Sequence, residues 1–516
     1  MSQFELIGEL LAGLRKEEIR SLRRFLQLFE EGSDTNKLKG LVLLELLLNA
    51  RKYSEEKVCT KLYGDSSPGS MKTFNKMLLR FKDKIYELLI LDINLYRKEG
   101  SDDLNRAVSE VRKKLLQVHV LDKKVPNHEL HRLYEKIKVT ARKYELYDEL
   151  LQCLAGQLNM DDGHALAAHT MTEILYYERC RNSLLKARDI YIRLVQQKEE
   201  QHILRDAAMY DKGIDELEHE YRYTKSSAVG YMLNDLTCYY QKALGNYDEA
   251  EKAGHRVISI ISENPAVYRN ERMTKAFLSL AGIELCRYKF KQAESTLLRA
   301  LVYSKDNESL ALEAGEISFL SWFYRGQFEK ASQVLTGHAT KPENLPSLVT
   351  SKWSFFRAAS STAMGKTHDA LLLLQHTVEA EKVLPGWNAG VRLMVILNLV
   401  ESGKLDSVES HIENFRKFLE RNSKTNTVTQ RNFMIVKLLA RLANESFDFR
   451  ELMAKEKDNI SLLESNIPGL AWKPGSPELI IFPLWLRSKA TGIDYQALAT
   501  DWFENNKIPT GLTLFD

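Results

Sequence analysis

Cysteine and proline are both scarce in this chain of 516 residues. The five cysteines are an odd number, lie far apart and form no CxxC pair, so we expect them to be buried thiols in a reducing compartment. Only 11 prolines accompany 44% hydrophobic residues. This composition is typical of a folded, helix-rich protein and excludes a disordered one.

Long apolar runs are missing as well. The apolar residues 41–48 are interrupted by Glu45 and residues 479–486 by Pro483, so neither stretch could form a membrane-spanning helix of about 18 residues. The N-terminal sequence MSQFELIGELL has no basic residue ahead of its apolar part, which a secretory signal would have. We therefore expect a cytoplasmic protein without membrane insertion.

A strong excess of one charge is also absent, because 73 Lys and Arg face 70 Asp and Glu and leave a net charge of +3. The whole molecule therefore has no general attraction to nucleic acid or anionic lipid. Sustained alternation of apolar and polar residues, which would indicate strands, is hard to find. The sequence predicts an all-α protein.

The clearest pattern that is present lies in residues 240–265, YQKALGNYDEAEKAGHRVISIISENP. Gly245 is predicted to end one helix and Tyr247 lies at the start of the next. Ala250 is small enough to let the second helix lie close against the first, and Pro265 ends the pair. The stretch therefore predicts two antiparallel helices.

Similar sequence motifs follow at a nearly constant spacing. After Ala250 the small residue recurs at Ala293, Ala331, Ala370 and Val408, in steps of 43, 38, 39 and 38 residues. Residues 143–147 and 444–447 are candidates for an earlier and a sixth turn. A non-repetitive helical bundle that reuses helix–turn–helix pairs is the alternative interpretation.

This order of small residue, aromatic residue, Ala and Pro resembles the tetratricopeptide repeat (TPR), whose helix pairs stack on one another. The resemblance implies a TPR-like solenoid, which is a right-handed superhelix of antiparallel helix pairs. Its inner groove would be lined chiefly by the first helix of each pair.

The chain is expected to divide into four segments. Residues 1–100 predict an N-terminal helical domain, and residues 101–225 predict long connecting helices with degenerate repeats. Residues 226–465 carry the TPR-like repeats. Residues 466–516 predict a loop rich in Pro and Gly, followed by two short helices, 478–489 and 495–505, that would cap the last repeat.

The N-terminal segment holds one basic helix face. A long helix is predicted over residues 70–96, and Lys72, Lys76, Arg80 and Lys84 share one face of it because they recur every four residues. A short helix capped by Ser54, then a turn, then this basic helix have the outline of a helix-turn-helix, whose second helix enters the major groove of DNA. A solvated basic face, or one that receives an acidic protein, is the alternative.

Motifs for catalysis or cofactor binding are incomplete. Residues 364–367, Met-Gly-Lys-Thr, carry the ending of a phosphate-binding loop, but Ser360 stands where that loop needs a glycine and the preceding residues are predicted to be helical. His128 and His131 are three residues apart, whereas the zinc-protease helix places its histidines four apart. We therefore expect no cofactor, no metal site and no enzymatic activity.

Binding residues are expected among polar or aromatic positions on the first helices of the pairs. These candidates are Asn234, Tyr239, Lys275, Arg287, Trp322, Arg325, Lys352, Arg357, Arg392 and Asn398. They predict a non-enzymatic scaffold or adaptor that binds another protein or a peptide in the solenoid groove.

The alternative function is a regulator in which the repeats sense a peptide or protein and the N-terminal domain binds DNA or protein. That arrangement is similar in outline to bacterial peptide receptors that join a small helical or DNA-binding domain to tetratricopeptide repeats. In this case residues 1–100 would bind nucleic acid, and the affinity would fall steeply as the salt concentration rises. An enzyme would instead have a deep polar pocket with perturbed ionisable groups.

Overall fold

The protein is all-α over the residues that its computed structural model describes, and no strand occurs among them. The described residues are 2–14, 16–30, 39–48, 54–91, 103–122, 124–160, 164–196, 203, 206–304, 307–337, 346–378, 386–423, 429–465, 467 and 469–505. None of the helices in these ranges combines the length and the apolar character that crossing a bilayer requires.

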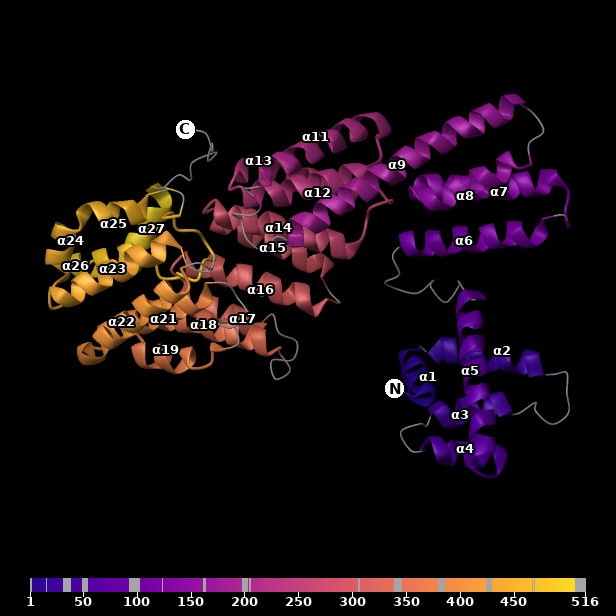
Figure 1. Ribbon diagram of the computed structural model, residues 1–516, viewed down its shortest axis with the longest axis horizontal. Helices are drawn as coiled ribbons and strands as arrows, with labels where there is room; N and C mark the ends of the chain where they lie inside the picture. Colours follow the sequence, from indigo (N-terminus) through magenta and orange to yellow (C-terminus); the bar gives the residue numbers. More distant parts are fainter. Residues whose placement is uncertain are drawn as a thin grey trace. The chain divides into compact units, whose positions relative to one another are not determined.

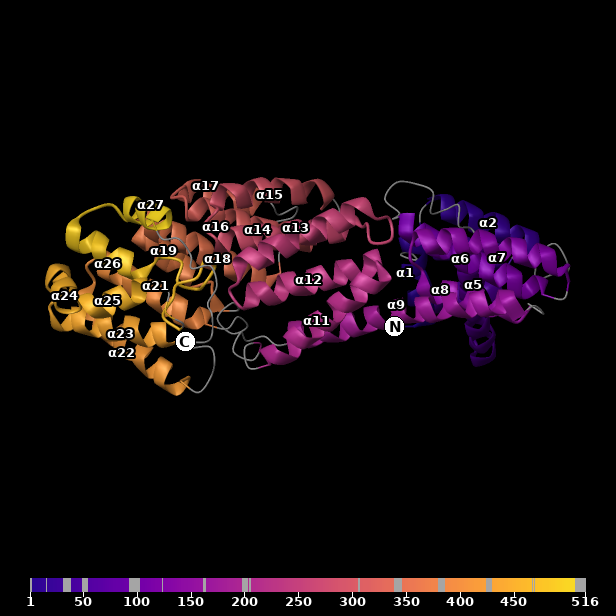
Figure 2. The ribbon, with the colours of Figure 1, turned by 90° about the horizontal axis from the view of Figure 1, so that it is seen from above.

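The chain divides into two compact units, Met1–Met160 and Asp161–Asp516, which we describe separately. Figures 1 and 2 show their helices in two views. The predicted division into four segments is finer than this and stays a prediction.

The first unit begins with five helices that share one hydrophobic core. They are α1 (Gln3–Gly13), α2 (Lys16–Glu30), α3 (Lys39–Leu48), α4 (Glu55–Tyr63) and α5 (Pro68–Leu91). Helix α5 buries Phe74, Leu78, Phe81 and Ile85 in this core. The predicted helix over residues 70–96 is thus present to Leu91, and its last five residues lie outside the described ranges.

Three antiparallel helices complete the first unit. They are α6 (Asp103–Leu121), α7 (Asn127–Lys143) and α8 (Tyr147–Leu158). Helix α7 packs against both α6 and α8, and Figure 1 shows the three side by side.

The second unit starts with the long helix α9 (His164–Gln196) and with α11 (Ala207–Thr224), and then continues as helix pairs. The pairs are α12 (Ser227–Ala243) with α13 (Tyr247–Glu263), α14 (Asn270–Cys286) with α15 (Phe290–Tyr303), α16 (Glu308–Phe323) with α17 (Phe328–Gly337), α18 (Ser347–Ala363) with α19 (Thr367–Leu374), α21 (Trp387–Glu401) with α22 (Leu405–Arg421), and α23 (Gln430–Asn444) with α24 (Phe449–Lys455). The second helix of each of the first five pairs also packs against the first helix of the next pair. The predicted succession of adjacent helix pairs is therefore confirmed.

One turn geometry joins the two helices of every pair. Among the described residues it occurs seven times, with a residue of positive φ at Glu145, Gly245, Tyr288, Gly326, Gly365, Gly403 and Ser446. In each turn the next residue donates its backbone N–H to the carbonyl oxygen five positions earlier, at 2.8–3.1 Å. This bond satisfies a carbonyl group at the end of the first helix, which is the Schellman arrangement. The earlier and the sixth turn expected from the sequence have the same geometry as the others.

The small residue after each turn lies at the contact between the two helices. Ala250, Ala293, Ala331, Ala370 and Val408 each have 0% exposed surface. A larger side chain at these positions would force the two helices apart, since a packed interior has no room for added atoms. The role that the sequence predicted for the small residue is confirmed.

The described part of the chain ends in three short helices and an irregular stretch between them. The helices are α25 (Lys457–Glu464), α26 (Phe482–Thr491) and α27 (Tyr495–Asn505). The predicted bounds of α27 are confirmed, but the helix expected from residue 478 begins only at Phe482. Two contacts explain the later start. Glu478 accepts a hydrogen bond from Arg431, and the N–H of Ile481 donates to the hydroxyl of Tyr495 at 2.9 Å. Pro483 then occupies the first turn of α26, where proline is favoured.

Candidate functional site

The non-helical residues 469–481, which we call the C-terminal segment, lie against the first helices of the later pairs. The N–H of Gly475 donates to the hydroxyl of Tyr324, at the end of α16, at 3.1 Å. On α21, a Cβ atom at Gly390 would lie 2.5 Å from the carbonyl oxygen of Pro477, so only glycine leaves room for the segment there. The segment is therefore in direct contact with both helices.

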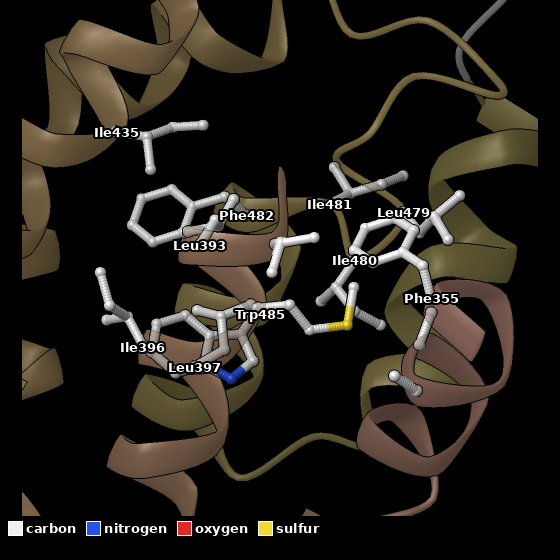
Figure 3. Close-up of a cluster of buried hydrophobic side chains, with 14 of the residues drawn as sticks. Phe355, Leu393, Ile396, Leu397, Ile435, Leu479, Ile480, Ile481, Phe482 and Trp485 are labelled. Carbon is white, nitrogen blue, oxygen red and sulfur yellow. The ribbon is translucent and has the colours of Figure 1, made fainter. Parts of the chain in front are cut away.

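The apolar side of the C-terminal segment is part of the hydrophobic core (Figure 3). Residues 479–481 have only 1–2% of their surface exposed. They belong to the same buried cluster as Phe355 of α18, Leu393 of α21 and Ile435 of α23. The first helices of the later pairs thus bind a non-helical stretch of the chain through apolar side chains.

A buried ion pair fastens the segment to α23. Arg431 and Glu478 have 6% and 7% of their side-chain surface exposed. The guanidinium donates Nε to one carboxylate oxygen at 2.5 Å and Nη2 to the other at 2.8 Å. Its Nη1 donates to the carbonyl oxygens of Leu463 and Leu470, both at 2.6 Å. This bidentate pair is fully hydrogen-bonded, which a buried charge requires.

The first helices of the two earlier pairs present a polar face instead. We call it the α12–α14 face and define it by Tyr231, Asp235, Tyr239 and Lys242 on α12 and by Arg272, Lys275, Ser279 and Gly282 on α14. The two helices touch along it. Arg272 lies over the ring of Tyr231, with Cζ 4.9 Å from its centroid, and the amine of Lys242 lies 3.1 Å from the place of a Cβ on Gly282. Tyr239 is 39% exposed, and Lys275 is also exposed, so the face is open to solvent.

A carboxylate and three tyrosines meet at one end of this face. We call Asp235, Tyr231 and Tyr239 of α12 with Tyr191 of α9 the Asp235 cluster. The rings of Tyr191 and Tyr239 pack edge to face with centroids 6.4 Å apart. Burial raises the pKa of Tyr191, and the negative charge of Asp235 raises it further. The side chain of Asp235 is therefore close enough to Tyr191 to influence its ionisation.

Asp235 itself is half-buried and unpaired. Burial raises the pKa of its carboxyl to about 6, although the positive charges of Arg272 and Lys275 oppose the shift. Among the described residues, no hydrogen bond or ion pair reaches this carboxylate. Arg272 donates to the carbonyl oxygen of Val267 at 3.1 Å, and Lys275 pairs with Glu271 at 2.6 Å. Arg272 and Lys275 thus form this hydrogen bond and this ion pair with groups other than Asp235.

Further along, Lys352 of α18 is already held by the protein. Its amine pairs with Glu316 of α16 and lies 5.7 Å from the ring centroid of Phe356 and 5.8 Å from that of Trp387. Burial raises the pKa of Glu316, while the charge of Lys352 opposes that shift. This pair joins two neighbouring first helices.

The structure places the other predicted binding residues in several environments. Asn234 and Asn398 are buried and donate to backbone carbonyls of their own helices at 2.8 Å. Arg287 pairs with Asp248 at 2.5 Å and with Glu251, so it joins one helix pair to the preceding one. Of the ten predicted residues, Tyr239 and Lys275 lie together on the α12–α14 face.

The remaining arginines mostly contact aromatic rings. Arg325 lies over Trp322, with Cζ 4.3 Å from the ring centroid, and Arg392 lies over Phe418 at 4.8 Å. Arg357 is half-buried, and this burial lowers the pKa of its guanidinium. Any binding role of these residues stays a prediction.

The prediction from sequence missed Asp235, Tyr231 and Tyr191. Asp235 and Tyr231 precede Tyr239 by four and eight residues on one helix, so helical spacing alone could have placed them on the same face. Tyr191 carries no such signal, because it belongs to α9 and lies outside the repeats.

The basic face of the first unit is present as the sequence predicted. Lys72, Lys76 and Arg80 are exposed on α5, Lys84 is half-buried, and none of the four forms an ion pair with a described residue. One acidic residue lies just before this helix. Hydrogen bonds from Ser70 and Ser67 lower the pKa of Asp65, which keeps a negative charge at the end of the helix that a helix-turn-helix would point toward DNA.

The stretch that resembles a phosphate-binding loop is an ordinary repeat turn. Gly365 has φ 72° and ends α18, and helix α18 precedes it as the sequence predicted. A pocket of about 560 Å³ lies beside this turn and is lined by Lys366, Glu401, Lys489 and Asp494 among others. Glu401 and Lys489 pair with each other at 2.5 Å, and Glu401 also accepts from the indole of Trp485 at 2.7 Å. These charges therefore fasten α26 to α21.

No protein-family model matches this chain, and no curated protein matches it either. The proposed function therefore rests on the geometry of the site.

Proposed function

We propose that this protein is a non-enzymatic scaffold or adaptor that binds an extended segment of another protein along the first helices of its helix pairs. In this proposal the pairs are TPR-like repeats that stack into a right-handed superhelix, and the α12–α14 face is the open part of its groove. The partner is a peptide or a protein segment.

The observation that carries the proposal is the position of the C-terminal segment. Residues 479–481 belong to one buried hydrophobic cluster with Phe355, Leu393 and Ile435, which lie on three successive first helices (Figure 3). The surface formed by first helices is therefore suited to non-helical chain, as in other modes of peptide recognition that reuse helical grooves. The equivalent surface on α12 and α14 is polar and partly exposed, at Tyr239 and Lys275 above all, which suits a partner that binds and dissociates.

Affinity capture from an extract of the source cells tests the proposal. The intact protein is compared with a double variant, Tyr239→Asp with Lys275→Glu, which changes the α12–α14 face. The matched control is Leu298→Asp, a 61% exposed residue on the second helix α15 of the same unit. We expect one protein partner that the control retains and the double variant loses. Equal capture by all three proteins would contradict the proposal.

A second candidate function has one observation in its favour. Lys72, Lys76 and Arg80 are exposed and form no ion pair with the described residues, so the face could neutralise phosphates of nucleic acid. The charge of Asp65 at the start of α5 opposes this reading of the face. A DNA-binding regulator would bind duplex DNA, and the triple variant Lys72→Glu, Lys76→Glu and Arg80→Glu would lower the slope of log affinity against log salt by about 2–3. A wild-type chain that binds no duplex at low salt excludes it.

A further inference from the structure

One exposed face of helix α5 carries positive and negative charges in separate halves. We call it the α5 stripe and define it by residues at the helical spacings of three and four, which are Lys72, Lys76, Leu79, Asp83, Tyr86 and Glu87. All six are exposed to solvent. The two lysines come first along the helix and the two acids last. The charge of the stripe therefore changes sign along its length.

The charges of the α5 stripe have no partner among the described residues. None of the four forms an ion pair there, whereas the exposed Glu413 on α22 pairs with Arg416 of its own helix at 2.7 Å. Like charges four residues apart on a helix repel each other, and the stripe contains two such pairs. This order of charges costs the isolated helix some stability, which a partner with the reverse order would offset.

The apolar residues of the stripe favour a protein partner. Leu79 is 43% exposed and Tyr86 is 41% exposed, and both lie among the charged side chains. Exposed apolar and aromatic residues with charges around them are typical of the centre and rim of a protein interface. A leucine gives nothing to a phosphate backbone, and Asp83 and Glu87 would repel it. The stripe therefore suits another helix better than nucleic acid.

The stripe is complementary to itself when two copies lie antiparallel. A two-fold axis between positions 79 and 80 places each residue opposite the one that is equally far beyond the axis. Lys72 then faces Glu87 of the second copy, and Lys76 faces Asp83 of the second copy. The symmetry forms each of these ion pairs twice, and the two copies of Leu79 meet beside the axis.

We propose that the α5 stripe binds the same stripe of a second copy of this protein, with the two helices antiparallel. The contact would extend over residues 72–87, which is about 24 Å of helix. An interface of this size is small, so the dimer is weak and its ion pairs mainly fix the orientation. Salt should loosen it, because the charges are exposed. This inference goes beyond the proposed function and does not involve the α12–α14 face.

Sedimentation velocity of the intact protein, at concentrations from about 1 to about 200 μM, tests the inference, because a small interface dissociates in this range. The variants are Lys76→Glu, Asp83→Lys and the double variant with both changes. The matched control is Lys57→Glu, which makes the same change of charge at an exposed position of α4 in the same unit. Thermal unfolding verifies that each variant is folded.

We expect the wild type to form a dimer. Each single variant should raise the dissociation constant at least about tenfold, because it places like charges opposite each other twice in the dimer. The double variant exchanges the two charges and should bring the dissociation constant back to within about threefold of the wild-type value. Lys57→Glu should leave it unchanged.

Three results would overturn the inference. They are a wild-type chain that stays monomeric over the whole range, single variants that form dimers as well as the wild type does, and a double variant as weak as the single ones. A monomeric wild type that binds duplex DNA would assign this face to nucleic acid instead.

Discussion

At the scale of single residues, the unpaired carboxylate of Asp235 should lower the stability of the folded chain. Its pKa of about 6 lies above the usual 3.8, so the folded protein binds this proton more tightly than the unfolded chain does. The stabilisation from protonating Asp235 is therefore gained as the pH falls through 6 and is lost as the pH rises past 6. A residue that destabilises the fold at neutral pH is a candidate for selection by function.

Asp235→Asn should therefore stabilise the protein. We expect the free energy of unfolding to rise by about 1–2 kcal/mol near pH 8, since one pKa unit corresponds to roughly 1.4 kcal/mol and part of the group remains solvated. The gain should vanish near pH 4, where Asp235 is protonated. Chemical denaturation at several pH values measures it, with Asp369→Asn as the control. A loss of stability at pH 8 would mean that Asp235 has a structural partner.

A second prediction concerns the buried pair of Arg431 and Glu478. Glu478→Gln leaves the guanidinium of Arg431 charged and buried, and breaking such a pair costs about 3–5 kcal/mol. The exposed pair of Glu413 and Arg416 is a matched control, and Glu413→Gln should change stability little. Thermal unfolding compares the two variants. Equal effects would show that burial does not distinguish these pairs.

At the scale of elements, the repeated turn is the feature that holds each helix pair together. Gly365 and Gly403 have positive φ, and a Cβ at either position would meet no atom within 4 Å. Alanine there suffers only the backbone penalty of the left-handed conformation, which is about 1–2 kcal/mol. Gly365→Ala and Gly403→Ala should each reduce the free energy of unfolding by this amount.

The matched control for the turns is a glycine inside a helix. Gly8 of α1 also has open space around its missing Cβ but has no positive φ. Gly8→Ala should therefore stabilise the protein by about 0.5–1 kcal/mol. Chemical denaturation measures the change in the free energy of unfolding, which should be negative for the turn glycines and positive for Gly8→Ala. A stabilising Gly365→Ala would contradict the assigned turn conformation.

Much of the helix-pair architecture could be predicted from sequence, because glycine indicates a turn with positive φ and alanine indicates a close contact between helices. Gly245, Gly326, Gly365 and Gly403 mark turns for this reason. Tyr288 adopts the same positive φ without being glycine, so backbone preference gave only a partial signal there. The ring of Tyr288 packs on Trp472, Trp502 and Phe503, which compensates for the strained backbone.

The candidate site was less predictable than the turns. The sequence indicated Tyr239 and Lys275 from their place on first helices. It could not indicate Tyr191, whose approach to Tyr239 depends on how α9 packs on α12. It also gave no path for the C-terminal segment, because an irregular stretch has no periodicity and its position follows from distant contacts such as Gly390 with Pro477.

At the scale of the whole molecule, the C-terminal segment completes the hydrophobic core of the later pairs. Removing residues 466–516 would expose Phe355, Leu393 and Ile435, which are now almost fully buried. We expect the truncated chain to bind a hydrophobic dye, to associate with itself and to unfold at a lower temperature. Dye fluorescence and light scattering measure this change. A truncated chain that stays monomeric and equally stable would show that the segment is not part of the core.

The central claim is that the α12–α14 face binds a segment of another protein, and photo-crosslinking tests it most directly. A photoreactive phenylalanine analogue is placed at Tyr239, or at Leu298 as the control on α15, and the intact protein is irradiated in an extract of the source cells. We predict that position 239 forms crosslinks to one short stretch of one partner and that position 298 does not. The same crosslinks from position 298, or none from position 239, would contradict the claim.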